Sequence, residues 1–245
     1  MFDCELVGKI GSMALIRHDE YDIDYNVFSR VGAELITGFI WISSGAVEIG
    51  RIDYMRRNNG KEIDYSTQEE VNACYAAQGQ GILMENYRRF INPIYSVRQV
   101  LVEHQHFNEP EKCNFIRRLL LDCVKQNAIP IINYNDSVSN EETRKMELFN
   151  LRKKQEKVVE CIDNDETASE IAALVKSRFL VILTSSIGLL KDPNDESSLI
   201  KEVLGKNVCE LLDNVNELKK CCSGASRKGA NGMRAKLEYI SEPIK

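Results

Sequence analysis

The sequence lacks an excess of positive charge. Its 245 residues include 32 Lys and Arg residues against 37 Asp and Glu residues, which gives a net charge of −5. Proteins that bind nucleic acids usually present a basic face to the phosphate backbone, so we expect no nucleic-acid partner. An anionic substrate would need local positive charge, which a few individual lysines must then supply.

Long hydrophobic runs are also missing. The longest apolar stretches are about as long as one strand, well short of the ~20 residues that span a membrane. The first residues, Met1 to Glu5, have neither the basic part nor the apolar part of a secretory leader. We therefore expect a cytoplasmic protein with no membrane partner.

No pair of cysteines has C-x-x-C spacing, although the chain contains eight. Reduced thiols are favoured over a disulfide scaffold or a zinc site. The adjacent Cys221 and Cys222 could be redox-reactive, but a loop position without a function is favoured. His104 and His106 have a metal-like spacing, yet nothing nearby completes a ligand set, so we expect no metal site.

Short apolar segments alternate with segments of helical spacing. The predicted strands are 6–10, 35–42, 97–102, 129–133, 179–183 and 199–203. The predicted helices are 22–34, one that follows Ala46, 67–91, 114–126, 167–176, 208–219 and one from about Met233. The segment of about 137–160 is polar and is expected to be an exposed excursion, as a hairpin or a lid.

Fully apolar strands between amphipathic helices indicate a mostly parallel sheet that is covered on both faces. The sequence therefore predicts an α/β fold, a three-layer αβα sandwich with an open sheet, in a single domain of 1–245. In such folds ligands bind beyond the carboxyl ends of the strands. Four predicted strands are followed there by small polar groups: Gly11-Ser12, Ser43-Ser44-Gly45, Asn135-Asp136 and Thr184-Ser185.

Lys9 is the first candidate for binding a phosphate. A lysine in a strand is costly unless its ammonium reaches a partner or water, and the following Gly11 lets backbone N–H groups approach an anion. The alternative is a lysine on an edge strand that points into solvent. The segment does not fit the P-loop pattern G-x-x-x-x-G-K-[ST].

Three further segments combine hydroxyl, amide and carboxylate groups. The turn 43–46 could bind an anion at a helix N-terminus, and a simple N-cap serine is the alternative. The segment 132–136 could hold an amino group and a carboxylate together, and an Asx turn is the alternative. The segment 163–165 could position lysines or Mg²⁺, and a helix cap is the alternative.

The segment 229–236 contains glycines and then opens a helix. It could cradle a nucleotide phosphate, with Lys236 one turn inside the helix to stabilise a phosphoryl group in transfer. The alternative is a flexible loop.

Taken in order, these segments resemble the amino acid kinase family over essentially the whole chain. The segments that carry the resemblance are 9–12, 44–46, 79–80, 132–136, 163–165, 183–189 and 232–236, and 42–51 and 132–136 are the most telling. The pattern is most similar to that of the family members that phosphorylate glutamate in proline synthesis. Many of these carry a C-terminal RNA-modification-type (PUA) domain, which is not expected in this chain.

The resemblance implies an enzyme that binds ATP, Mg²⁺ and L-glutamate and makes glutamyl 5-phosphate. It implies a homo-oligomer, a dimer or tetramer. The catalytic residues would be Lys9, Asp165 and Lys236, and the glutamate-binding residues would be Ser44, Gly45, Asn135, Asp136 and Asn164. The ATP-binding residues would be Lys9, Gly11, Ser12, Thr184, Ser185, Ala230, Asn231, Gly232, Met233, Arg234, Ala235 and Lys236.

The sequence departs from the family pattern at the nucleotide side. Ser185 stands where the family usually has Asp, and Ala230 and Asn231 replace a Thr-Gly pair. Two alternatives stay open: a sibling kinase that acts on N-acetylglutamate, aspartate or uridylate, and a silent member that senses amino acid or nucleotide. The pattern at Asn135, Asp136 and Asn164 favours free glutamate, since an amino group needs acceptors.

Overall fold

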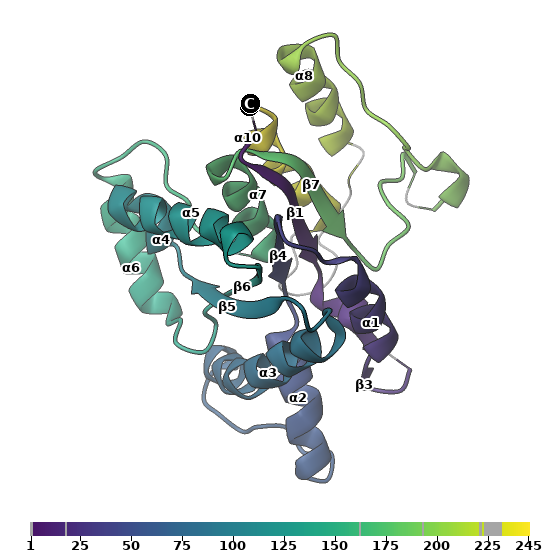
Figure 1. Cartoon of the computed structure of the whole chain (residues 1–245), viewed down its shortest axis with the longest axis vertical. Coiled ribbons are helices and arrows are strands. Elements are labelled where there is room, and N and C mark those ends of the chain that lie inside the picture. Colours follow the sequence, from purple (N-terminus) through teal and green to yellow (C-terminus); the bar gives the residue numbers. More distant parts are fainter. Residues whose placement is uncertain (1, 18, 162, 193, 221, 223–231) are drawn as a thin grey trace.

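The computed structural model describes residues 2–17, 19–161, 163–192, 194–220, 222 and 232–245. Its centre is a five-stranded sheet in the order β5-β6-β4-β1-β7, in which all neighbouring strands are parallel (Figure 1). These strands are β1 (Cys4–Ile10), β4 (Phe39–Ser43), β5 (Ser96–Val102), β6 (Ala128–Tyr134) and β7 (Ser177–Leu183). A separate antiparallel ribbon pairs β2 (Ile16–Arg17) with β3 (Asp22–Ile23).

Helices connect the strands. They are α1 (Tyr25–Glu34), α2 (Ala46–Arg57), α3 (Gln68–Phe90), α4 (Gln105–Asn108), α5 (Pro110–Lys125), α6 (Glu141–Arg152), α7 (Asn164–Leu174), α8 (Val208–Lys219), α9 (Gly232–Tyr239) and α10 (Ser241–Ile244), with short 3-10 turns η1 (Ser12–Leu15) and η2 (Glu196–Ser198). Within the described ranges, none of the helices combines the length and the apolar character that crossing a membrane requires.

The sheet is covered on both faces, as β4 shows most clearly. Trp41 packs into one core with side chains of α1, α2 and α3, whereas its neighbours Ile40 and Ile42 pack into a second core with α5 and α7. Successive side chains of a strand point to opposite faces, so a strand buried on both faces is apolar throughout. The predicted α/β sandwich with a mostly parallel open sheet is confirmed.

Two glycines allow α2 and α3 to cross in backbone contact. A Cβ added to Gly50 would lie 1.8 Å from the carbonyl oxygen of Tyr75, and one added to Gly79 would lie 1.9 Å from that of Ala46. Only glycine fits at these two positions. The close crossing places the start of α2 next to the middle of α3, where Gln80 follows Gly79.

Residues 179–183 form a strand, as predicted, but the prediction that this strand is buried was wrong. Strand β7 lies at the edge of the sheet and pairs with β1 alone among the described strands. One face packs toward α7 through Leu180, while Phe179, Val181 and Leu183 on the other face are 36–48% exposed. A run that is apolar on both faces is typical of a central strand, so the sequence alone did not indicate an edge.

Three other local predictions were wrong in whole or in part. The polar excursion is largely exposed, as predicted, but it contains helix α6 in place of a hairpin; Asn140 caps this helix, which buries Leu148. The segment 199–203 is not a strand, since only Leu199 forms an isolated bridge, to Leu190. Strand β4 begins later than predicted because Gly38, with φ of +94°, turns the chain just before it.

Candidate active site

The turn between β4 and α2 is the first component of the site. Gly45 has φ of +112°, a left-handed conformation that favours glycine, and it precedes the first turn of α2. Ser43 is fully buried, where it accepts a 2.7 Å hydrogen bond from the hydroxyl of Tyr87. Ser44 is partly exposed beyond the end of the strand, and its backbone N–H donates to the carbonyl of Ile10 at 3.1 Å.

The start of α7 is the second component. Asp163 is the N-cap, and its carboxylate accepts hydrogen bonds from the backbone N–H groups of Asp165 and Glu166 at 2.8 and 3.0 Å. The helix therefore starts at Asn164, earlier than the predicted 167. Because Asp163 takes the cap position, the side chains of Asn164 and Asp165 contact other parts of the site.

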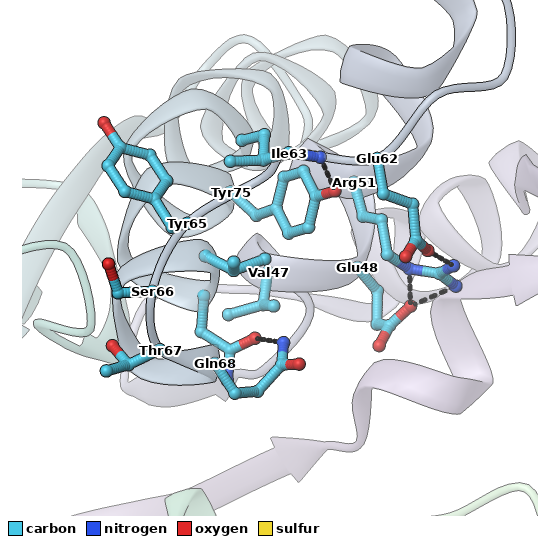
Figure 2. A pocket seen from close by; sticks show the side chains of 12 residues that line it. Val47, Glu48, Arg51, Glu62, Ile63, Tyr65, Ser66, Thr67, Gln68 and Tyr75 are labelled. Carbon is cyan, nitrogen blue, oxygen red and sulfur yellow. Dashed lines mark hydrogen bonds and ion pairs between the residues drawn. The ribbon is translucent and has the colours of Figure 1, made fainter.

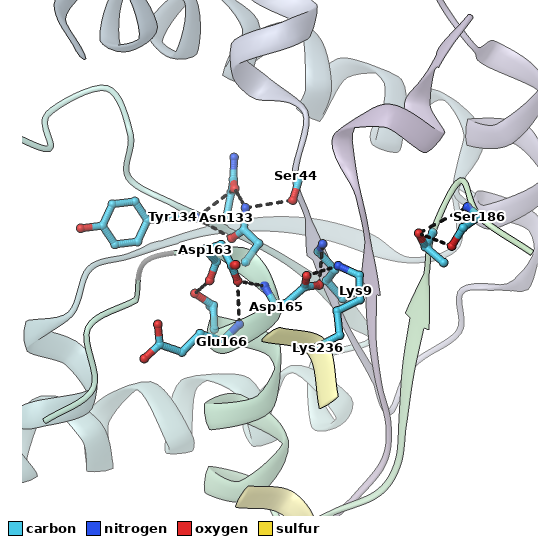
Figure 3. Close-up of polar contacts among 12 residues, drawn as sticks. Lys9, Ser44, Asn133, Tyr134, Asp163, Asp165, Glu166, Ser186 and Lys236 are labelled. Atoms are coloured by element: carbon cyan, nitrogen blue, oxygen red, sulfur yellow. Dashed lines mark hydrogen bonds and ion pairs between the residues drawn. The ribbon is translucent and has the colours of Figure 1, made fainter. Parts of the chain in front are cut away.

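Asp165 joins two lysines from distant parts of the chain. The ammonium of Lys9, on β1, lies 2.7 Å from one carboxylate oxygen, and the ammonium of Lys236, on α9, bonds to the other (Figure 3). The side chains of Lys9 and Asp165 are only 7% and 8% exposed, whereas that of Lys236 is 21% exposed. The alternative that Lys9 points into solvent is wrong.

The charge of this group is decided by competing effects on Asp165. Burial raises the pKa of its carboxyl, but the ammonium groups of Lys9 and Lys236 outweigh burial, and the net pKa lies below the ordinary value. Asp165 is therefore ionised at neutral pH. A single carboxylate with two ammonium groups leaves one excess positive charge at the carboxyl ends of β1 and β4.

Asn164 lies beside this charge and belongs to a chain of amides. Its side-chain NH₂ donates to the hydroxyl oxygen of Ser44 at 3.1 Å and to the amide oxygen of Asn133 at 2.8 Å. Asn133 in turn donates to the amide oxygen of Gln80, on α3, at 2.8 Å. Figure 3 shows Ser44 and Asn133 next to the ends of their strands, beside the lysine pair.

Asn133 and Gln80 were not among the predicted site residues. Asn133 is the second-to-last residue of β6 and is buried, although every other residue of this strand except Tyr134 is apolar. A buried amide in such a strand was the signal that could have indicated a site residue. Gln80 follows Gly79, one of the two glycines at the crossing of α2 and α3. The segment 79–80 is among those that carry the resemblance to the family.

Asn135 and Asp136 follow β6 at the same edge of the sheet. Asn135 donates to the carboxylate of Glu103 at 2.8 Å and accepts from the hydroxyl of Ser137 at 3.1 Å. Burial raises the pKa of Asp136 to about 6, although Arg144 opposes the shift. No hydrogen bond or ion pair to the Asp136 carboxylate occurs among the described residues, so this group is available to a ligand.

The structure thus brings together Lys9, Asp165 and Lys236, with Asn164 and Ser44 beside them, whereas Asn135 contacts Glu103 and Ser137 at the end of β6. A model of the amino acid kinase family matches residues 7–245. The chain belongs to this family.

Curated relatives named glutamate 5-kinase match most of the chain. The protein of Thermoanaerobacter sp. is 29% identical over 203 residues, which cover 81% of this chain and 47% of the relative. The protein of Caldanaerobacter subterraneus is 26% identical over 243 residues, which cover 95% and 57%. That of Burkholderia vietnamiensis is 27% identical over 246 residues, which also cover 95% and 57%. The chain spans about half the length of these relatives.

Several of the residues predicted for the nucleotide follow β1 and β7. The backbone N–H of Gly11 donates to the carbonyl of Leu183 at 3.2 Å, so the end of β1 is held beside the end of β7 and the following Thr184. Ser12 opens the turn η1, and Ser185 is exposed after β7.

The remaining nucleotide candidates belong to the segment of Lys236. Gly232, with φ of +67°, opens α9 and is buried. Met233 and Ala235 are partly buried in its first turn, and Arg234 is exposed. Ala230 and Asn231 lie outside the described residues.

Two cavities lie elsewhere. One, of about 420 Å³, is lined by α2, α3 and the segment between them, including the ion pair of Arg51 with Glu48 (Figure 2). The other, of about 530 Å³, lies between β5 and α5 and includes His106. His104, two residues before His106, is buried, and its Nε2 lies 3.1 Å from the carboxylate of Glu147. None of the predicted site residues lines either cavity.

Proposed function

We propose that this chain catalyses the ATP-dependent phosphorylation of the side-chain carboxylate of L-glutamate, which gives glutamyl 5-phosphate and ADP in the first step of proline biosynthesis. The support at the level of chemistry is the convergence of Lys9 and Lys236 on Asp165, with Asn164 and the hydroxyl of Ser44 beside them. The support at the level of the substrate is the name of the relatives, glutamate 5-kinase.

The lysine pair suits phosphoryl transfer. In such reactions negative charge spreads over the transferring group, and an enzyme contributes mainly by positioning and by neutralising this charge. Asp165 neutralises one ammonium and fixes the directions of both, which leaves a net charge of about +1 for the phosphoryl group. Two ammonium groups held in place before the reaction need no reorganisation when the charge develops.

The proposed step forms one bond and breaks another. A side-chain carboxylate oxygen of glutamate attacks the γ-phosphorus of ATP, and the bond from this phosphorus to the bridging oxygen of ADP breaks. The electron pair of that bond stays on ADP. The acceptor is already ionised at neutral pH, since glutamate has a pKa near 4.3, so the step needs no general base.

Three groups support an amino-acid substrate beside the lysines. Asp136 carries a carboxylate that suits an ammonium group, while the hydroxyl of Ser44 and the amide of Asn164 suit a carboxylate. An N-acetyl group would remove the ammonium and leave Asp136 without a partner. This argument favours free glutamate over N-acetylglutamate.

Nucleotide binding is proposed for the ends of β1 and β7 and the start of α9. Backbone N–H groups at a helix N-terminus bind phosphates, and Gly232 opens α9 close to Lys236. We propose that Asp165 and its two lysines lie next to the Mg²⁺ that accompanies the nucleotide. Mg²⁺ usually takes phosphate and water ligands together with one or two carboxylates, and Asp165 is a carboxylate at this position. No group of three or more acidic, His or Cys ligands occurs in the described part of the chain. When bound, Mg²⁺ would screen the charge of the phosphates.

The test is the release of ADP from Mg-ATP with glutamate, N-acetylglutamate, aspartate and uridylate as separate acceptors. We expect release with glutamate at a rate at least tenfold above that with any other acceptor. A faster release of ADP with one of the other acceptors would identify that acceptor, in place of glutamate, as the substrate. If glutamate raises the melting temperature but no ADP appears, the chain is a binding protein and the kinase proposal is wrong.

A further inference from the structure

One backbone group, the N–H of Tyr134, fixes the direction of a series of hydrogen bonds at the site. It points at the side-chain oxygens of Asn133 and Asn164, at 2.9 and 3.2 Å. A backbone N–H can only donate, so the group of each side chain that faces it must be the amide oxygen. The NH₂ groups of Asn133 and Asn164 must then point the other way.

The orientation of the Asn133 amide determines which atom of Gln80 faces it. The NH₂ of Asn133 can only donate, so the atom of Gln80 that lies 2.8 Å away is the amide oxygen. The NH₂ of Gln80 is therefore left over. It is buried, and no acceptor is within hydrogen-bond reach of it among the described residues. An unpaired buried donor is costly, and this cost stands against the acceptor that Gln80 provides to Asn133.

The orientation of the Asn164 amide determines the hydrogen bonding of the Ser44 hydroxyl. The NH₂ of Asn164 donates to the hydroxyl oxygen of Ser44 at 3.1 Å. That bond uses an acceptor site of the hydroxyl and leaves its hydrogen unused. No acceptor for this hydrogen occurs among the described residues, and Ser44 is partly exposed at the site. Ser44 is thereby set to donate to whatever binds beside it.

We propose that Gln80 is a positioning residue which, through Asn133 and Asn164, holds the Ser44 hydroxyl as a donor to a carboxylate of the substrate. Gln80 does not touch the substrate in this arrangement. It supplies an acceptor for the NH₂ of Asn133 at 2.8 Å, and this bond acts together with the N–H of Tyr134 to oppose a rotation of the Asn133 amide. The inference rests on the proposed function, because it assigns the carboxylate to a bound amino acid.

The experiment compares three substitutions on α3. Gln80→Leu removes the acceptor, whereas Gln80→Glu keeps an acceptor oxygen toward Asn133. Gln78→Leu is the matched control, because Gln78 lies on the same helix, is also partly buried, and makes one side-chain hydrogen bond, to Asp53, away from the site. For each variant we would measure the KM values for glutamate and ATP, kcat, and the shift of melting temperature with glutamate alone.

We expect Gln80→Leu to raise the glutamate KM by roughly tenfold, the equivalent of one hydrogen bond, with the ATP KM within about twofold. Gln80→Glu and Gln78→Leu should stay within about threefold of the parent in both KM values. In a Ser44→Ala background, Gln80→Leu should add little, since both changes act on the same contact. Purely structural damage would instead lower the melting temperature and raise both KM values in either background.

The outcomes separate this inference from the proposed function. If the parent protein phosphorylates glutamate and Gln80→Leu behaves like Gln78→Leu, Gln80 has no positioning role. If the parent protein forms no ADP but its melting temperature rises with glutamate, and Gln80→Leu loses that rise, the positioning role stands without the kinase. Additive effects of Gln80→Leu and Ser44→Ala would also overturn the inference, and so would a parent protein that neither binds nor phosphorylates glutamate.

Discussion

Lys9 and Lys236 bond to the two oxygens of one carboxylate, that of Asp165, although they lie near opposite ends of the sequence. The two lysines are not equivalent. Lys9 is buried on a central strand, whereas Lys236 is partly exposed on a short helix. Substitutions at the three positions should therefore have different effects on folding and on turnover.

Lys236→Ala should abolish phosphoryl transfer while the fold stays intact. The variant keeps the buried pair of Lys9 and Asp165, and it removes one of the two charges that would stabilise the phosphoryl group. We expect kcat to fall by about 100-fold or more, with a change in melting temperature of less than a few degrees. Lys245→Ala is the control for loss of a nearby exposed lysine. Unchanged turnover in Lys236→Ala would remove this residue from the mechanism.

Asp165→Asn should impair stability as well as turnover. The amide leaves Lys9 buried without a counter-charge and puts two ammonium groups close together, and breaking a buried ion pair costs about 3–5 kcal/mol. Denaturant unfolding at pH 7 should show this loss, and kcat should fall with it. A variant as stable as the parent protein would contradict the role of the carboxylate in holding both lysines.

Asp136→Ala should raise the glutamate KM by at least tenfold and leave the ATP KM within about twofold. The carboxylate pairs best with the substrate ammonium when it is ionised, and burial raises its pKa to about 6. The glutamate KM of the parent protein should therefore rise as the pH falls from 7 to 5, and Asp136→Ala should lose most of this dependence. Equal effects on the two KM values would argue against the assignment.

Asp136→Asn should stabilise the ligand-free protein at neutral pH. The pKa of Asp136 is higher in the folded chain, about 6, than the ordinary 3.8, so its neutral form is the one favoured by folding. Its contribution to stability is full below the unfolded pKa and is lost as the pH rises through 6. At pH 7.5 the amide should gain on the order of 1–3 kcal/mol, and at pH 4 little. Unfolding curves that differ equally at both pH values would refute this.

Gly79→Ala should strongly destabilise the fold. Its Cβ would lie 1.9 Å from the carbonyl oxygen of Ala46, so α2 and α3 would have to separate. We expect a loss of at least about 2 kcal/mol in the free energy of unfolding. Gly81→Ala, on the same helix, is the control: nothing lies within 4 Å of its added Cβ, and alanine should gain roughly 0.5–1 kcal/mol. Similar effects of the two substitutions would show that the crossing is not tight.

The sequence predicted the layers of the fold well because burial on both faces requires apolar residues at every position of a strand. It predicted burial of the last strand poorly for the same reason. Strand β7 is as apolar as β4, and only the order of the strands makes it an edge. Strand order depends on long-range pairing, which local periodicity does not contain.

For the candidate site, motif order brought Ser44, Asn164 and Asp165 forward as candidates: Ser44 follows a strand end, and Asn164 and Asp165 open a helix. Their contacts could not be predicted in the same way. The bonds from Asn164 to Ser44 and to Asn133 cross from α7 to two different strands. Gln80 was missed as a site residue because it lies in the middle of a helix, where no strand end drew attention to it.

The arrangement of Lys236 has a consequence for protein synthesis. Strands β1, β4 and β6 and helix α7 all precede α9 in the sequence, so a growing chain can assemble the sheet around Asp165 before Lys236 has left the ribosome. During that interval Asp165 is held by Lys9 alone. The lysine pair, and with it the proposed transfer of phosphate, would then appear only after the rest of the sheet has formed.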